Sequence, residues 1–164
     1  MKILILYTSK HGFTKACTTY LSDRLIGKVD VQNLDDNSQL SLDGYDWIVM
    51  GSAVYMGKIN KKMTLFSDKN RDKLLSHNIA LFTCCTTPQE SDKYLLTGFS
   101  KRLYEASKLN TNFGGKLQRE ELTFFERKLT DLISKTEGKV QQTFYENMDS
   151  LVRLINNSEQ SQKV

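Results

Sequence analysis

The sequence is poor in several residue types, and each shortage excludes a class of protein. One proline among 164 residues argues against a collagen-like or proline-rich chain. Two histidines and the absence of a Cys-x-x-Cys pair provide no spacing typical of a metal site, so we expect no bound metal. No apolar run approaches the roughly 18 residues of a membrane-spanning helix. We therefore expect no stable membrane insertion, which leaves peripheral contact as the one mode of membrane association.

Cysteine usage indicates a reducing environment. The sequence has three cysteines, Cys17, Cys84 and Cys85, and an odd number with two adjacent members does not form a disulfide framework. The opening stretch MKILILYTSK is too short to contain the apolar core of a secretion signal. We expect a cytoplasmic protein in which these cysteines are small packing residues.

Length and charge indicate one globular domain without a nucleic-acid surface. A chain of 164 residues fits a single core, which we expect to span residues 1–157, followed by a polar, frayed tail at 158–164. The net charge is +4, but lysines and arginines are scattered among acidic residues rather than clustered on one face. This pattern is typical of solvated helix faces, so we expect no nucleic-acid partner.

Short apolar runs alternate with longer segments of helical periodicity. The runs occupy residues 2–8, 28–34, 46–52, 78–85 and 110–117. The expected helices begin near Phe13 and span about 60–75 and 90–107, followed by one around residues 122–133 and a last one around 148–155. Parallel strands need crossover connections, which are usually helices, so this alternation predicts a parallel sheet with helices on both faces.

Residues 8–14, the first loop, follow the first buried strand and suit a terminal phosphate. Hydroxyls of Thr8, Ser9 and Thr14 can donate hydrogen bonds, and Gly12 lets the backbone approach a ligand. A helix starting near Phe13 would direct its free N–H groups to the same place. Neither G-x-G-x-x-G nor the Walker motif is present. The alternative is that Ser9 and Thr14 only cap the helix.

Two further strand ends suit a flat ring. After the strand at 46–52 come small residues, the aromatic Tyr55 and Gly57, and after the strand at 78–85 come small polar residues as far as Pro88. Ligands of open α/β sheets bind beyond the carboxyl ends of the strands. Together, the three strand ends predict a site for a planar ring with a phosphate tail.

The stretch ILYTSKHGFTKACTTYL resembles the flavodoxin phosphate-loop signature T-S-x-x-G-x-T, and the resemblance covers about the whole chain. It implies a three-layer, flavodoxin-like α/β fold with a five-stranded parallel sheet of order 2-1-3-4-5, binding FMN noncovalently. The resemblance assigns the phosphate to the first loop and the two sides of the ring to the other two strand ends. The implied FMN-binding residues are Thr8, Ser9, Lys10, His11, Gly12, Phe13, Thr14, Ser52, Ala53, Val54, Tyr55, Met56, Gly57, Thr83, Cys84 and Cys85.

Within this family, VMGSAVYMGKINKKMTLF and NFGGKLQREELTFFERKLTDLISK resemble segments of the menaquinone-dependent protoporphyrinogen dehydrogenases. Two functions follow from the resemblance: a carrier that moves electrons through the flavin, or an oxidoreductase of that type acting in haem biosynthesis. The partner would be a redox protein or a quinone, and the basic charge favours an acidic protein or a quinone at an anionic membrane surface. A third alternative is a receiver-type signalling domain without a flavin. Such a domain needs paired acidic residues at the end of the first strand, where this chain has YTSK, so the sequence disfavours it.

Overall fold

The computed structural model describes residues 1–36, 40–116 and 142–161. Within them, five parallel strands lie in the order β2 (Lys28–Asn33), β1 (Lys2–Thr8), β3 (Trp47–Tyr55), β5 (Asn78–Cys84) and β6 (Asn110–Asn112). A short strand, β4 (Lys58–Ile59), pairs antiparallel with the end of β3. Counted along the chain, the parallel strands have the order 2-1-3-4-5, which confirms the expected doubly wound sheet.

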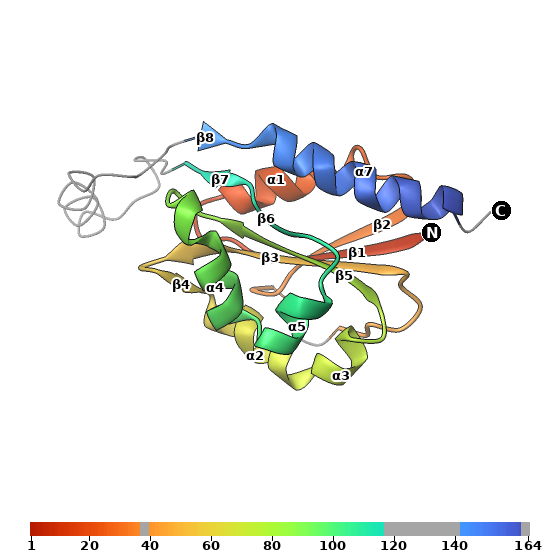
Figure 1. The fold of residues 1–164 in the computed structure, drawn as a ribbon, viewed down its shortest axis with the longest axis horizontal. Helices are drawn as coiled ribbons and strands as arrows, with labels where there is room; N and C mark the ends of the chain where they lie inside the picture. The colour runs from red at the N-terminus through yellow and green to blue at the C-terminus, as the bar shows by residue number, and fades with distance from the viewer. Residues whose placement is uncertain (37–39, 117–141, 162–164) are drawn as a thin grey trace.

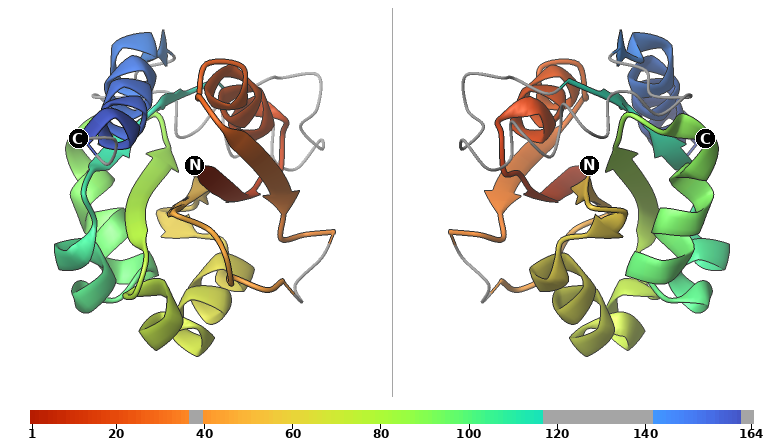
Figure 2. Two further views of the ribbon diagram at one scale, coloured as in Figure 1. Left: turned by 90° about the vertical axis from the view of Figure 1, so that its right-hand side faces the viewer. Right: turned by 90° about the vertical axis from the view of Figure 1, so that its left-hand side faces the viewer.

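Helices cover both faces of the sheet (Figure 1). One layer contains α1 (Phe13–Ser22) and α7 (Tyr145–Ser161). The other contains α2 (Lys61–Lys69), α3 (Arg71–Leu74), α4 (Ser91–Gly98) and α5 (Lys101–Ala106). Figure 2 shows the sheet end-on, with α1 and α7 on one side and the shorter helices on the other. The three-layer architecture expected from the sequence is therefore confirmed.

Strand alternation explains why β1 reads as a continuous apolar run. Ile3 and Ile5 pack toward α1 and α7, whereas Leu4 and Leu6 pack toward the opposite helices, and all four are 0–1% exposed. A strand covered by helices on both faces exposes neither side to solvent, so its sequence does not alternate between apolar and polar residues. Strand β2 lies at the edge and is only partly buried, as its mixed sequence predicts.

Three expected elements are divided in the structure. The helix expected at 60–75 breaks at Asn70 into α2 and α3. The one expected at 90–107 becomes a 3-10 turn (Pro88–Glu90), α4 and α5, and Ser100 caps α5 by accepting a hydrogen bond from the Leu103 amide. The expected strand at 110–117 ends at Asn112, and β7 (Gly114–Gly115) then pairs with β8 (Gln142–Thr143) in a second, antiparallel sheet. A left-handed φ of +84° at Gly114 accompanies this change of direction.

The end of the chain also differs from the expectation. Helix α7 continues to Ser161, so residues 158–161, which we expected in a frayed tail, are helical. The Trp47 indole donates a hydrogen bond of 3.0 Å to Ser158 Oγ, which attaches the end of α7 to the start of β3. The helix expected around residues 122–133 lies outside the described residues.

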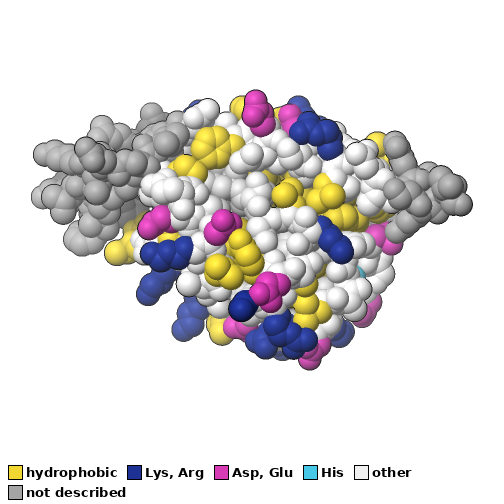
Figure 3. Space-filling model, viewed as in Figure 1, with side chains coloured by type: hydrophobic (Ala, Val, Ile, Leu, Met, Phe, Trp, Pro, Cys, Tyr) yellow, Lys and Arg dark blue, Asp and Glu magenta, His cyan; other side chains and the backbone are white. Residues whose placement is uncertain are grey.

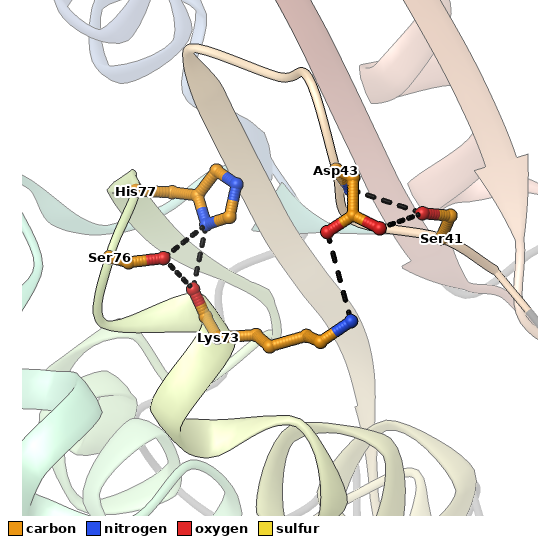
Figure 4. Close-up of polar contacts among 5 residues, drawn as sticks. All are labelled: Ser41, Asp43, Lys73, Ser76 and His77. Atoms are coloured by element: carbon orange, nitrogen blue, oxygen red, sulfur yellow. Dashed lines mark hydrogen bonds and ion pairs between the residues drawn. The ribbon is translucent and has the colours of Figure 1, made fainter.

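A polar cluster joins the segment before β3 to α3 at the amino-terminal edge of the sheet (Figure 4). Ser41 Oγ donates to Asp43 at 2.8 Å, and Lys73 Nζ lies 3.7 Å from the other carboxylate oxygen. The Ser41 hydroxyl and the Lys73 charge lower the pKa of Asp43. His77 Nδ1 lies 2.7 Å from the Lys73 carbonyl oxygen. The His77 ring therefore caps the end of α3, and we assign it no catalytic role.

Candidate functional site

A cavity opens at the carboxyl edge of the parallel strands. Its walls are the first loop, the end of β3, the segment after β5 and the short strand β7. The residues that line it are Ser9, Lys10, His11, Phe13, Thr14, Ala53, Val54, Tyr55, Cys84, Cys85, Thr86, Gly115 and Lys116.

The first loop places buried polar atoms at this cavity without partners. Ser9 Oγ, His11 Nε2 and Thr14 Oγ1 are shielded from solvent, and none makes a hydrogen bond of normal geometry among the described residues. The one polar neighbour of the Thr14 hydroxyl that bears on this is the Cys84 thiol, whose pKa the hydroxyl lowers slightly against the larger effect of burial. The Thr14 side chain is fully buried. Leaving a buried hydroxyl unsatisfied costs about 1–3 kcal/mol. Three such atoms around one cavity are what a site for a polar ligand group requires.

The alternative in which Ser9 and Thr14 cap α1 is wrong. The residue at the cap position is Gly12, with a φ of +75°, and no side chain accepts a hydrogen bond there. The free N–H groups at the start of α1 are thus available to a ligand, and the helix dipole favours an anion at that position.

Three expected residues, Thr8, Ser52 and Thr83, do not line this cavity. Thr8 Oγ1 donates to Ser52 Oγ at 2.9 Å, and Ser52 Oγ donates to the Ala53 carbonyl at 2.7 Å. Thr83 Oγ1 lies 2.9 Å from Ser91 Oγ, which joins β5 to α4. These hydroxyls are satisfied within the protein, so they hold the strand ends in register and are not free to bind a ligand in this conformation.

Met56 and Gly57, which we also expected at the site, do not line this cavity. They form the two-residue turn between β3 and β4, where Tyr55 pairs with Lys58. Their φ values are +49° and +74°, the signs that a type I′ hairpin turn requires. The expected ring-facing loop is therefore a tight hairpin, and only its β3 arm reaches the cavity. The sequence has a glycine at only one of these two left-handed positions, so it does not predict the tight turn.

An aromatic contact links the first loop to this hairpin. Lys10 Nζ lies 3.9 Å from the centroid of the Tyr55 ring, and both residues line the cavity. Tyr55 is 40% exposed, so one part of the ring is open to a ligand or to solvent. A cation over an exposed aromatic ring is worth about 0.5–1 kcal/mol.

The three thiols are free and buried. Burial is the main cause that raises the pKa of Cys84 far above its usual range, and the neighbouring Cys17 thiol adds to it. Burial likewise raises the pKa of Cys85. Thiols held neutral in this way are poor nucleophiles. Their role at the cavity is to present small, apolar surface.

Thr86, Gly115 and Lys116 are lining residues that the sequence interpretation did not assign to the site. A Cβ on Gly115 would lie 2.9 Å from both the Cys85 carbonyl carbon and Thr86 Cγ2, so only glycine lets β7 approach this closely. The glycine pair in NFGGKL was a signal of such an approach. Gly115 lies beside the segment after β5 because β7 pairs with β8. The sequence around Gly115 does not predict that pairing.

Among the described residues, no helix is long and apolar enough to cross a membrane. No group of three or more His, Cys, Asp or Glu side chains within the same ranges could hold a metal ion.

Comparison with known proteins identifies the family. A family model described as a flavodoxin domain matches residues 4–143, which is most of the chain. The chain belongs to the flavodoxin family. An uncharacterised protein of Methanocaldococcus jannaschii is 39% identical over 70 residues, which are 42% of this chain and 45% of that protein. This flavodoxin-family chain thus aligns with less than half of that relative's length.

Solved structures share the flavodoxin fold at low identity. Rubredoxin oxygen:oxidoreductase from Desulfovibrio gigas has a TM-score of 0.55 at 14% identity, over 94% of this chain and 36% of its own. A Fusobacterium nucleatum flavodoxin bound to flavin mononucleotide has a TM-score of 0.53 at 11% identity, over 99% of this chain and 98% of its own. At these identities the likeness shows the fold alone. Neither comparison indicates the protoporphyrinogen dehydrogenase branch.

Proposed function

We propose that this flavodoxin-family protein binds FMN noncovalently in the cavity beside the first loop and carries electrons through the flavin. The observation that supports the proposal most is the set of unpartnered buried polar atoms on the first loop, Ser9 Oγ, His11 Nε2 and Thr14 Oγ1. The fold match to a flavodoxin solved with flavin mononucleotide supports the same ligand.

The residues of the cavity fit the two ends of this cofactor. Ser9 and Thr14 would donate hydroxyl hydrogen bonds to the phosphate, together with the free N–H groups at the start of α1. Tyr55 on β3 and Cys84 and Cys85 after the opposite strand would flank the ring. The flavin supplies the redox chemistry when bound, while the protein binds and orients it and limits its contact with water.

Nothing in the described residues favours oxidation of protoporphyrinogen over simple electron transfer. The cavity is lined by the elements to which we assign the flavin, and burial raises the pKa of the Cys84 and Cys85 thiols beside it. Electron transfer is therefore the function that we propose for this site.

A titration tests the cofactor directly. Protein stripped of flavin is titrated with FMN and, separately, with riboflavin, which has the same ring without the phosphate, and flavin fluorescence quenching is followed. We expect binding of FMN in the micromolar range or tighter and clearly weaker binding of riboflavin. Equal affinities would contradict a phosphate site on the first loop, and no binding of either would overturn the proposed function.

A further inference from the structure

The cavity to which we assign the flavin has two walls that come from different parts of the chain. One is the end of β3 with the hairpin that follows it, and the other is the segment that begins at Cys85, between β5 and α4. Backbone pairing joins β3 to β5 only as far as Ala53 and Cys84. Beyond these two residues the separation of the walls depends on side-chain contacts.

Tyr94 on α4 lies beside both walls. Its side chain is 5% exposed and belongs to the same hydrophobic cluster as Cys85 and Ile59. A Cβ on Gly57 would lie 4.0 Å from Tyr94 Cε1, so the ring lies beside the turn of the hairpin. Helix α4 also packs closely on β4, because a Cβ on Gly98 would meet Ile59 Cδ1 at 2.6 Å.

The Tyr94 hydroxyl is connected to the second wall by two hydrogen bonds. It donates to the Glu90 carboxylate, and it lies 3.0 Å from Thr87 Oγ1. A tyrosine hydroxyl has one proton, which is used for the carboxylate, so Thr87 is the donor in the second bond. The Thr87 carbonyl oxygen accepts a hydrogen bond of 3.5 Å from the Cys85 thiol, which continues these contacts to the cavity lining.

The surroundings of Glu90 keep it an acceptor for this contact. The hydrogen bond from Tyr94 is the main cause that lowers the pKa of Glu90, and the Lys93 ammonium group, 3.6 Å from the carboxylate, adds to it. Figure 3 shows acidic and basic side chains interspersed on the face of the molecule where α4 lies. Mixed charges of this kind are typical of a solvated helix face, whereas Tyr94 is buried beneath it.

We propose that Tyr94 is a positioning residue for the flavin ring, because its side chain fixes the separation of the two walls between which we place that ring. This inference rests on the proposed function, which supplies the ligand of fixed thickness. Tyr94 does not itself line the cavity. Removing its hydroxyl should therefore loosen the Cys85 wall without removing a contact to the ligand, and the phosphate end on the first loop should be unaffected.

Flavin binding tests this role with Tyr94→Phe, which keeps the aromatic ring beside Gly57 and removes only the hydroxyl. Tyr104→Phe on α5 is the matched control, because its hydroxyl also interacts with a carboxylate, that of Asp92, and lies outside the cavity lining. FMN and riboflavin are titrated into each variant, and fluorescence quenching is followed. We expect Tyr94→Phe to weaken binding of both flavins by the same factor, about threefold to tenfold, as for the loss of one hydrogen bond. Tyr104→Phe should leave both affinities unchanged.

Thiol reactivity provides a readout that needs no flavin. The flavin-free protein is labelled with iodoacetamide, and mass spectrometry follows each cysteine separately. We expect Tyr94→Phe to speed labelling of Cys85 by about threefold to tenfold, because the same lost bond favours local opening of its segment. Labelling of Cys17, which is buried in the cluster on the other face of the sheet, should not change. A general loss of stability would instead expose both thiols alike.

Thr87→Val removes the same hydrogen bond from its other end. We expect it to weaken binding of both flavins, and the double variant to bind no more weakly than Tyr94→Phe alone, because the two hydroxyls act through one bond. Additive losses, a loss confined to FMN, equal effects of Tyr104→Phe, or equal labelling of Cys85 and Cys17 would overturn the positioning role. So would a lower thermal midpoint with unchanged flavin affinities and Cys85 labelling. If neither flavin binds while Cys85 alone is labelled faster in Tyr94→Phe, the proposed function fails and Tyr94 still fixes the wall.

Discussion

Lys10 Nζ lies 3.9 Å from the centre of the Tyr55 ring, and this contact connects the loop after β1 to the end of β3. The two residues are 45 positions apart, yet both line the cavity at the carboxyl edge of the sheet. The Tyr55 ring thereby holds the Lys10 ammonium group beside the proposed flavin position.

Replacing this charge should alter the redox balance of the flavin. We expect Lys10→Met to weaken binding of the reduced, anionic flavin about tenfold more than binding of oxidised FMN, because a cation within a few ångströms favours the anion by about 1 kcal/mol or more. The measurement is a spectroelectrochemical titration, in which the midpoint potential should become more negative. Lys28→Met, at the far edge of the sheet, is the control. Equal weakening of both redox forms would show that Lys10 acts by contact alone.

The Thr14 hydroxyl should matter to the ligand and not to the fold. Thr14→Val removes an unpartnered, fully buried hydroxyl. We expect FMN affinity to fall about tenfold to a hundredfold, as for the loss of one hydrogen bond to a charged group. The thermal midpoint of the flavin-free protein should stay constant or rise, because an unsatisfied polar atom has gone. Thr19→Val, exposed on the same helix, should leave FMN affinity unchanged; loss of stability without loss of affinity in Thr14→Val would contradict the assignment.

The centre of the sheet leaves no room beside Gly51. A Cβ there would lie 2.2 Å from the Phe82 ring, which itself stacks on Phe113 with centroids 4.5 Å apart. We expect Gly51→Ala to lower the free energy of unfolding by about 1–3 kcal/mol or more through overpacking. Urea denaturation measures the loss, and adding Phe82→Leu should recover part of it, since the two positions are in contact. Additive losses in the double variant would exclude this explanation.

Stability should depend on Tyr45 at high pH. Burial and a 2.8 Å hydrogen bond from its hydroxyl to Asp30 raise the pKa of Tyr45 to about 12. A raised pKa means that the neutral form is stabilised by folding, so the contribution is present below the unfolded pKa of 10.0 and is lost as pH rises through about 12. The difference in unfolding free energy between the protein and Tyr45→Phe should therefore shrink across this window. A difference that stays constant there would contradict the assignment.

Much of the fold could be predicted because its signals are local. The apolar run of β1 reflects burial on both faces, and the loop after it has the composition of a phosphate site. Ser9 and Thr14 line the cavity because each lies where a strand ends and a helix starts, and their assignment to a phosphate stays a prediction.

The failures concern contacts between distant segments and finer backbone geometry. Gly115 reaches the cavity through pairing of β7 with β8, far along the chain, and its neighbours do not reveal that pairing. Met56 adopts a left-handed conformation that its side chain disfavours, so no propensity would place the turn there. Thr83 and Ser52 are polar residues at strand ends, where composition alone cannot separate a ligand-binding hydroxyl from one that joins two elements.

The bond between Trp47 and Ser158 turns the chain's single indole into an optical reporter. Its ring is 3% exposed at the start of β3, at the end of the strand opposite the cavity. Undocking of the last helical turns would wet this fluorophore and shift its emission to the red. Ligand binding at the carboxyl edge would leave the surroundings of the indole largely unchanged. Tryptophan fluorescence therefore reports docking of the end of α7 independently of ligand binding.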